Sequence, residues 1–279
     1  GVTFGPTGAA YIAEHDGCTV ASVTAGGTLA TLAGVALTCS HANGVGPLAA
    51  FARPSAIAFF AGTLFIRDAS FFLRQLTIAT ADAQDKAGNG MAGALDGPHG
   101  TALVDPQDLA VDSSGNIYFT DSTNQMIRKV DFATAAVTTA AGSGATGSAD
   151  NVIGLHASFD LPRGIAVDDN GYVFVAEQNG GGIRLLAPNG VVTSLTPTNA
   201  LLSPQSVDVA ANGDVVVADT GNKVVRAYQV TPPAAPAASP LAPSIQLALP
   251  EAGTCGTPGT DNGASATAGF NAPAGIEAD

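Results

Sequence analysis

The chain has 279 residues, 46% of them hydrophobic, and its 23 acidic against 10 basic side chains give a formal charge of −13 at pH 7. A field of that sign repels phosphate backbones and argues against nucleic acid as a partner. No apolar run reaches the roughly 18 residues of a membrane-spanning helix, so no membrane span is predicted. The 34 Gly and 17 Pro are typical of an all-β fold with many short strands.

One phrase recurs along the chain: a Pro, a short apolar strand, a turn with Gly, a second apolar strand that ends in an acid, and a third strand that contains Arg. Residues 1–34 form a copy that lacks its opening. A weak copy covers residues 51–78, the two clearest copies cover 105–142 and 159–195, and a further copy covers 202–230.

The copy at 159–195 predicts four strands. They cover Ile165–Val167, Tyr172–Ala176, Ile183–Leu186 and Val191–Leu195. The turns between them contain Asp-Asn-Gly and Pro-Asn-Gly, in which Gly and Asn accept the positive φ angles of tight hairpins. Four antiparallel strands at a period of roughly 40–60 residues indicate the blades of a β-propeller.

The two ends of the chain are expected to be complementary parts of one copy. Residues 270–279 (FNAPAGIEAD) are the opening of a repeat, whereas residues 1–34 lack one. We therefore predict five four-stranded blades, closed by a C-terminal strand at Ala274–Ala278 that joins the N-terminal blade. The repeat prolines that give this count are Pro54, Pro106, Pro162, Pro204 and Pro273.

The repeated phrase, P-x-G-I-A-V-D-x-x-G-x-x-Y-V-A-D followed by R-I-R-K-V and V-T-T-L-A-G, resembles that of the NHL-repeat family. The resemblance covers nearly all of residues 1–279 and is most specific in the copies at 105–142 and 159–195. It implies a single NHL-type β-propeller domain. Many members of the family have six blades, so the resemblance leaves open a sixth blade outside this chain.

The longest interval between repeat prolines contains a Pro-rich insertion, residues 231–243. Such a sequence favours extended backbone, and we expect either a rigid surface excursion before a strand at Ser244–Leu249 or an O-glycosylated patch. No Asn-x-Ser/Thr sequon occurs, so N-glycans are not expected. Few Lys, many Ala, Gly, Thr and Pro, and the start at Gly1 favour an extracellular or cell-surface protein that is a processed product or part of a larger chain.

An acid at the end of the second strand and an arginine in the third strand recur in the repeat. Four of the seven arginines occupy this place, while the N-terminal copy has Glu14 but Ala21. Because each Arg lies across a hairpin from its acid, we predict structural ion pairs within the blades instead of a charged binding ring. The pairs are Asp68–Arg74, Asp121–Arg128, Glu177–Arg184 and Asp219–Arg226.

The residues after the repeat prolines precede the innermost strands and are expected at the mouth of a central channel. This position varies from copy to copy, as a specific binding site requires, and Arg163 is the one charged residue directly after a repeat proline. The alternative is a water-filled channel without a ligand. The channel-mouth binding candidates, with their neighbours, are Ser55, Gln107, Asp108, Arg163, Gln205 and Ser206.

The four histidines are the candidates for a metal site. His15 falls in a hairpin turn, and His41, His99 and His156 fall in connections between blades. The peptidylglycine amidating lyases are related propellers that hold zinc through channel histidines, but no matching motif surrounds these four. Calcium-binding propeller lactonases match no better, and an Asp-x-Asp-x-Asp-Gly loop is missing. We predict surface histidines and no cofactor.

The three cysteines are too few for a disulfide framework. Cys18 and Cys39 fall in the first copy, and Cys255 falls in the connection that leads into it. We predict a Cys18–Cys39 disulfide, with Cys39–Cys255 as the alternative. The remaining thiol is either buried or pairs with another chain.

These observations favour an extracellular binding or assembly module over an enzyme. A rigid propeller would present variable loops to a protein, a glycan or a copy of itself, because loops on a stiff scaffold commonly carry recognition. The competing function is a metal-dependent lyase or hydrolase that acts in the central channel. The variable segments are Val35–Ala50, Asp82–Thr101, Ser143–Ser158 and Thr231–Gly269.

Overall fold

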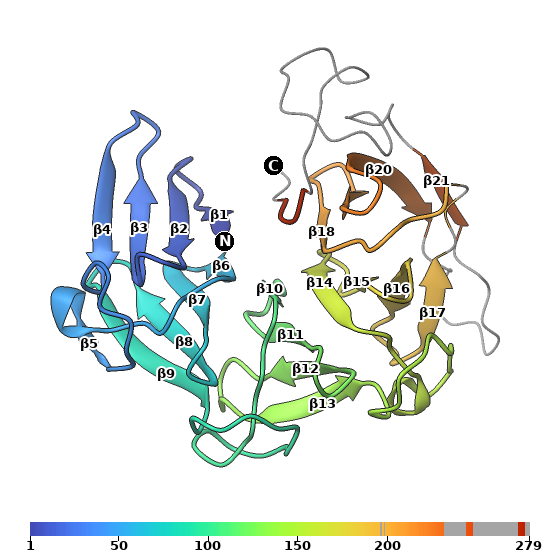
Figure 1. Ribbon diagram of the computed structural model, residues 1–279, viewed down its shortest axis with the longest axis horizontal. Helices are drawn as coiled ribbons and strands as arrows, with labels where there is room; N and C mark the ends of the chain where they lie inside the picture. Colours follow the sequence, from blue (N-terminus) through green and yellow to red (C-terminus); the bar gives the residue numbers. More distant parts are fainter. Residues whose placement is uncertain (196, 198, 232–243, 248–272, 277–279) are drawn as a thin grey trace. The chain divides into compact units, whose positions relative to one another are not determined.

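The computed structural model of the chain describes residues 1–195, 197, 199–231, 244–247 and 273–276. In this part the chain is all-β, and five antiparallel sheets form the blades of a five-bladed β-propeller (Figure 1). The fold class predicted from the sequence is therefore confirmed. No helix in the described residues is long and apolar enough to cross a membrane.

Every blade is an antiparallel meander in which strands pair in chain order. The first blade comprises β1 (Val2–Phe4), β2 (Ala10–Glu14), β3 (Thr19–Val23) and β4 (Leu29–Ala33). The second comprises β6 (Ile57–Phe60), β7 (Thr63–Asp68), β8 (Phe72–Thr77) and β9 (Asp82–Gly88), with the short β5 (Gly44–Val45) added beside β9. The third comprises β10 (Leu109–Val111), β11 (Ile117–Asp121), β12 (Met126–Val130) and β13 (Val137–Ala141).

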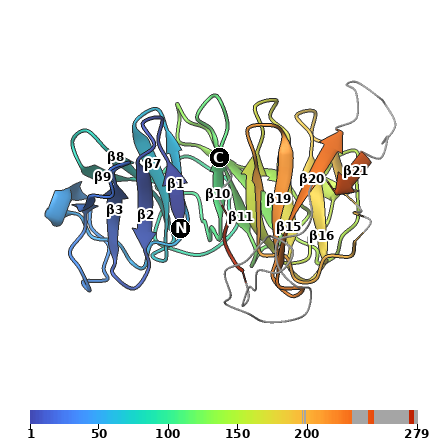
Figure 2. The ribbon, with the colours of Figure 1, turned by 90° about the horizontal axis from the view of Figure 1, so that it is seen from above.

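The last two blades repeat the same order. The fourth comprises β14 (Pro162–Val167), β15 (Val173–Glu177), β16 (Gly182–Leu186) and β17 (Val192–Leu195). The fifth comprises β18 (Ser206–Val209), β19 (Asp214–Asp219), β20 (Val224–Thr231) and β21 (Ser244–Leu247). Strands β15 and β16 run side by side (Figure 2). In their antiparallel register, Val175 lies opposite Arg184. Two short 3-10 helices, η1 (Gly46–Leu48) and η2 (Gly154–His156), lie between blades.

The chain divides into two compact units, which are described separately. The first comprises Gly1–Asp121 and Arg128–Thr139. Its core lies on both faces of β7, because side chains along a strand alternate between the two faces. Leu64 and Ile66 pack with residues of the first blade, whereas Phe65 packs with residues of the third, and all three side chains are fully buried.

The second unit comprises Ser122–Ile127 and Ala140–Asp279. Its core lies between the fourth and fifth blades, where Phe174 of β15 and Ile183 of β16 pack with Val217 of β19 and the buried Tyr228 of β20. Neighbouring blades thus bury one apolar face of each sheet against the next sheet, as in the first unit. This packing needs strands with buried residues on both faces, which the apolar runs of the repeat supply.

The strand predictions for the fourth blade hold to within one residue at three of the four strands, and the innermost strand begins earlier, at Pro162. One predicted loop is wrong in part. The segment Asp82–Thr101 was expected to be a variable loop, but Asp82–Gly88 is the fourth strand of the second blade. This strand contains three charged residues and only two apolar ones, so its sequence lacks the usual apolar alternation. The strand predicted at Ser244–Leu249 is present in the fifth blade as β21, over Ser244–Leu247; residues 248 and 249 lie outside the described residues.

The predicted closure of the first blade by the C-terminal tail is also wrong. The innermost strand of that blade is β1, which pairs with β2 in the register Val2–Ile12, so the sheet has four strands without the tail. Pro273–Ile276 forms no strand, and its carbonyl at Pro273 accepts a hydrogen bond from Thr220 of the fifth blade. β1 has only three residues between Gly1 and Gly5, too short a run for the repeat pattern to predict.

The repeat ends in a glycine because two backbone segments touch there. Gly34 and Gly142 directly follow the fourth strands of the first and third blades, and Gly88 ends that of the second, with φ between +94° and +104°. An added Cβ at these positions would lie 2.5–2.7 Å from the carbonyl oxygen of the residue that closes the turn between the second and third strands. Both the positive φ and the close approach therefore require glycine.

We expect Gly88→Ala to lower the free energy of unfolding by about 3 kcal/mol. Its new Cβ would lie 2.5 Å from the carbonyl oxygen of Phe71 and 2.8 Å from a methyl carbon of Val104. Gly62→Ala is the matched control, because Gly62 has φ +80° but no atom within 4 Å of the added Cβ. The control is expected to cost about 1–2 kcal/mol, the conformational cost alone. Equal losses in chemical unfolding of the two variants would contradict the steric argument.

Candidate functional site

The four predicted acid–arginine pairs all meet in the structure. Each arginine lies in the third strand of its blade and each acid ends the second strand, and both side chains are almost completely buried. The nitrogen–oxygen distances are 3.4 Å for Arg74–Asp68, 3.4 Å for Arg128–Asp121, 3.1 Å for Arg184–Glu177 and 2.8 Å for Arg226–Asp219. Buried charges require such partners because water cannot solvate them.

Arg184 also holds the chain segment that leads into its blade. Its guanidinium donates to the backbone carbonyls of Ala149 at 3.0 Å and Ser158 at 2.7 Å, and to the carboxylate of Asp150 at 3.0 Å. The guanidinium carbon lies 5.0 Å from the ring centre of Phe159. One buried side chain therefore fixes both ends of the segment 149–158.

Arg74 makes the same set of contacts in the second blade. It donates to the carbonyls of Ala42 at 2.9 Å and Ala50 at 3.0 Å, and its guanidinium carbon lies 5.1 Å from the ring centre of Phe51. Burial lowers the pKa of Arg74, and the neighbouring carboxylates of Asp85 and Asp68 partly restore it. The segment 42–50 is thus held as the segment 149–158 is.

Arg128 of the third blade also holds the segment that precedes its blade, but it does so through the carboxylate of Asp96. It pairs with Asp96 of the preceding segment at 2.8 Å. The Asp96 carboxylate in turn accepts hydrogen bonds from the N–H and the hydroxyl of Thr139 at 3.1 and 3.0 Å. In three blades, therefore, a buried arginine ties the preceding interblade segment to the sheet.

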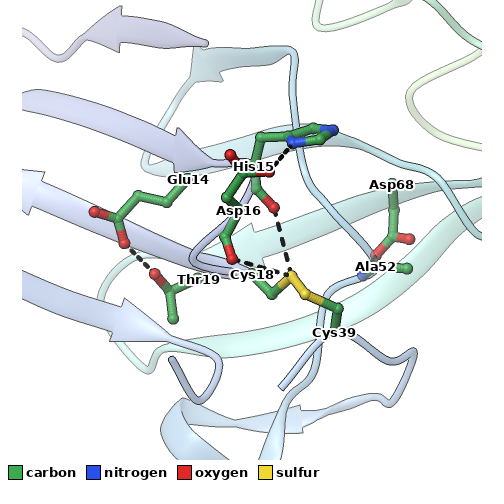
Figure 3. The surroundings of a disulfide bond; sticks show 8 residues. All are labelled: Glu14, His15, Asp16, Cys18, Thr19, Cys39, Ala52 and Asp68. Atoms are coloured by element: carbon green, nitrogen blue, oxygen red, sulfur yellow. Dashed lines mark hydrogen bonds and ion pairs between the residues drawn. A yellow bond between two sulfur atoms is a disulfide. The ribbon is translucent and has the colours of Figure 1, made fainter. Parts of the chain in front are cut away.

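The first blade lacks the arginine and has a disulfide instead (Figure 3). Cys18 and Cys39 are bonded, with their Cα atoms 5.2 Å apart, which confirms the preferred pairing. Glu14 accepts a hydrogen bond from Thr19, next to the turn that holds Cys18. The disulfide fixes the segment after the blade, whereas the arginines fix the segment before it. Cys255 and the Pro-rich insertion 231–243 lie outside the described residues, although Thr231 itself ends β20.

The interblade segments present most of the exposed apolar side chains. Of the fourteen exposed large hydrophobic residues in the described part of the chain, ten lie between blades. Leu37 is 81% exposed and Leu48 is 76% exposed. The ten residues are Val35, Leu37, Val45, Leu48, Met91, Leu95, Val152, Ile153, Leu155 and Leu202. Exposed apolar side chains are therefore concentrated on the interblade segments of the described part of the chain.

Among the channel-mouth candidates of the first unit, Ser55 contacts an arginine that was not among the predicted site residues. Arg67 of β7 donates to the hydroxyl of Ser55 at 2.7 Å and to the carbonyl of Pro106 at 2.6 Å. Next to Pro106, the side-chain amide of Gln107 lies 3.4 Å from the carboxylate of Asp105. The Asp108 carboxylate accepts a hydrogen bond from the adjacent Leu109 N–H at 2.9 Å.

Arg67 had one signal in the sequence. It precedes the repeated acid of its blade, where the other blades have Ala13, Thr120, Ala176 and Ala218. A charged residue at one copy of an otherwise small position is typical of a local role and not of the repeat.

The candidates of the second unit have separate partners. Arg163 donates to the side-chain carbonyl of Gln178 at 2.8 Å. The backbone N–H of Gln205 donates to the backbone carbonyl of Ala218 at 3.2 Å. The Ser206 hydroxyl accepts a hydrogen bond from the N–H of Ile276 at 3.4 Å. All three lie at or just before the start of an innermost strand, where the sequence places them.

The four histidines have different surroundings. His15 contacts Asp16 and is exposed, and His99 and His156 are exposed as well. His41 pairs with Asp85 at 2.8 Å and stacks on Phe72, and Asp85 also pairs with Arg74. His41 therefore belongs to the arginine network. Among the described residues, no group of three or more His, Cys, Asp or Glu side chains has the arrangement of a metal site.

The region around the third and fourth blades can be compared with known families. Residues 109–205 match the family model of the SMP-30/gluconolactonase/LRE-like region. The match begins at the first residue of β10 and ends just before β18, so it spans two complete blades. The third and fourth blades are therefore similar to this family, over less than half of the chain.

One curated relative matches over a short stretch. It is the protein SUPPRESSOR OF QUENCHING 1, chloroplastic, of Arabidopsis thaliana, with 38% identity over 87 residues. The matched stretch covers 31% of this chain and only 8% of that protein. The relative's activity is therefore not transferred.

Solved structures show the same fold at low sequence identity. Virginiamycin B lyase from Staphylococcus aureus is 12% identical with a TM-score of 0.56, over 81% of this chain and 64% of that chain. A chain of a nidogen/laminin complex is 16% identical with a TM-score of 0.58, over 81% of this chain and 73% of that chain. At these identities the likeness concerns the propeller fold alone.

Proposed function

We propose that this chain is an extracellular binding or assembly module that presents its interblade segments to a partner protein. The proposal rests on one observation: exposed apolar side chains lie on interblade segments that buried arginines hold in place. The segments 42–50 and 149–158 are each fixed at both ends by one buried arginine, yet Leu48 and Leu155 on them are exposed. Pre-organised loops lose less conformational entropy on binding than mobile ones.

Three further features support the proposal. A disulfide is typical of proteins in oxidising compartments, which agrees with an extracellular location. The repeat resembles that of NHL propellers, and a propeller of similar fold occurs in the nidogen/laminin complex. Exposed leucine and valine side chains favour a protein partner over a glycan, because glycans offer less apolar surface.

The competing function, a metal-dependent lyase or hydrolase, has a direct test. Elemental analysis of the purified full chain would show one equivalent of zinc or calcium if the enzyme function were correct. The match to a gluconolactonase-like region concerns the third and fourth blades.

We expect the double variant Leu48→Asp/Leu155→Asp to lose partner binding by at least about thirtyfold, the effect of removing an interface hot spot. Both side chains are exposed, so its midpoint of thermal unfolding should stay close to that of the unmodified protein. The partner is first isolated from the extracellular fraction of the source organism, then purified, and its Kd is measured by calorimetry. Ser113→Asp, which adds a charge in an exposed turn within the third blade, is the matched control. Unchanged affinity in the double variant would refute the proposal.

A further inference from the structure

In the second and third blades, a side chain at the end of the second strand holds the repeat proline of the next blade. Arg67 of β7 donates to the carbonyl of Pro106 at 2.6 Å. Ser122, which directly follows β11, donates its hydroxyl to the carbonyl of Pro162. Each proline opens the blade that comes next along the chain. This contact therefore marks the place where a neighbouring blade begins.

Pro273 is held by the fifth blade in the same way. The hydroxyl of Thr220 donates to the Pro273 carbonyl. Thr220 directly follows the repeated acid of its blade, as Ser122 does. Three residues after the proline, the N–H of Ile276 donates to the hydroxyl of Ser206 in β18 at 3.4 Å. Pro273 therefore lies where a blade after the fifth would begin.

The innermost strands of neighbouring blades approach each other at equal positions of the repeat. Gly164 and Ser206 each stand two residues after a repeat proline, and a Cβ added to Gly164 would lie 2.6 Å from the Cα of Ser206. In the first unit Gly1, which aligns with Gly164, has the Cα of Ala56 at 3.1 Å from an added Cβ. The contact of Ile276 with Ser206 departs from this register by one residue. Residues 273–276 thus follow β18 as an innermost strand would.

The sequence around Pro273 also repeats the sequence around Pro162. Both prolines begin the sequence Pro-x-Gly-Ile. The Asp-Asn pair at 261–262, which lies outside the described residues, precedes Pro273 by the same distance in sequence as the Asp-Asn pair at 150–151 precedes Pro162. A segment of this kind followed by this proline is the way in which the fourth blade begins.

We propose that residues 273–276 begin the innermost strand of a sixth blade, which packs against the fifth and is completed by residues that follow Asp279 in the whole protein. The first blade cannot take this strand, because β1 already fills its innermost place by pairing with β2. An innermost strand pairs with the second strand of its own blade, as β14 does with β15. The opening of a blade alone therefore forms no sheet, and the rest of the repeat is the occupant of this face.

The regular blades predict the chemistry of the sixth. In the third, fourth and fifth blades the buried acid follows the repeat proline by 15 residues and the buried arginine follows it by 22, as from Pro162 to Glu177 and Arg184. The sixth blade is expected to have an acid and an arginine at the same two distances from Pro273. The two charges would then be buried as a pair, as they are in the other blades.

The messenger RNA beyond the codon for Asp279 gives the first test. We expect the acid and the arginine at the two positions given above, each within an apolar stretch of strand length. A stop codon directly after Asp279, or a continuation that lacks the two residues, would overturn the inference.

A protein extended by a copy of residues 166–195, joined directly to Ile276, gives the second test. The copy contains one arginine and no lysine, so trypsin has a single added site. We expect cleavage there at least about tenfold slower than in a matched extension with the same residues in scrambled order, because proteolysis follows the population of the open form. Thr220→Val should speed cleavage of the extended protein by about fivefold, since it removes the donor to Pro273.

Two results of this second test would contradict the inference. Equal cleavage of the ordered and the scrambled extension would mean that the fifth blade does not receive another blade. A stable dimer of the unextended chain that Thr220→Val dissociates, observed by native mass spectrometry, would mean that a second copy occupies this face.

Discussion

Replacing Arg184 with methionine is expected to lower the free energy of unfolding by about 3–5 kcal/mol, the usual cost of breaking a buried ion pair. The substitution leaves the Glu177 carboxylate buried without its cation. It also removes the donors to the carbonyls of Ala149 and Ser158. Methionine keeps most of the apolar volume of the arginine stem, so the loss reports on polar contacts rather than on a cavity. Denaturant unfolding at pH 7 gives the measurement.

Arg163→Met is the matched control. Arg163 lies in β14, the innermost strand of the same blade, where it is only partly buried and donates to Gln178. The same substitution should therefore cost about 1 kcal/mol or less. The double variant Glu177→Gln/Arg184→Met removes both charges and should recover part of the loss, since no buried charge then remains unpaired. A single variant as stable as the control would show that the arginine clamp is dispensable.

The loss in Arg184→Met should also depend on pH. Burial raises the pKa of Glu177 above its ordinary value of 4.5, and Arg184, the N–H of Asp160 and the Ser148 hydroxyl partly lower it. Without Arg184 the pKa rises further. A carboxyl with a raised folded-state pKa favours the folded state below its unfolded pKa, and that contribution is lost as the pH rises through the folded pKa. The deficit relative to the unmodified protein should therefore shrink as the pH falls from 7 towards 4.5. A deficit of constant size would contradict this assignment.

The features that the sequence predicts well are those that recur with a fixed period. The hairpin turns follow from Asn-Gly steps, and the spacing between Glu177 and Arg184 places them across a hairpin, where the structure has them. Each such feature depends on a few residues close together in the chain. Local spacing is sufficient to predict it.

The features that the sequence predicts poorly depend on single contacts between distant residues. The bridges of Gly97 and Asn151 to the sheet edges involve one residue each, which leaves no periodic pattern. Arg67 of the second blade contacts Pro106, which precedes the third blade. The only sequence signal for this contact is that Arg67 departs from the small residue usual at its position in the repeat. No repeat proline precedes the short β1 in this sequence, so the spacing of the prolines does not indicate it. Alignment from the acid backwards matches Gly1–Glu14 with Gly164–Glu177 and places Val2–Phe4 on β14.

Reduction of the Cys18–Cys39 disulfide is expected to lower the free energy of unfolding by about 3 kcal/mol. The two cysteines are 21 residues apart, and a cross-link that closes a loop of this length removes about that much chain entropy from the unfolded state. Cys18 is fully buried in a turn with φ +56°, and the Leu37 N–H donates to the carbonyl of Gly17 at 2.8 Å. Without the cross-link, this single backbone bond would hold the exposed Leu37 near the turn.

Unfolding with and without a reducing agent, followed by tryptic mapping of the oxidised protein, measures the effect. The double variant Cys18→Ala/Cys39→Ala should unfold like the reduced protein and should no longer respond to the reducing agent. Cys255→Ser should keep the full response, because Cys18 and Cys39 remain bonded to each other. A Cys255→Ser protein that has lost its response would show that Cys255 takes part in the bond, and the anchoring role assigned to Cys39 would then fall.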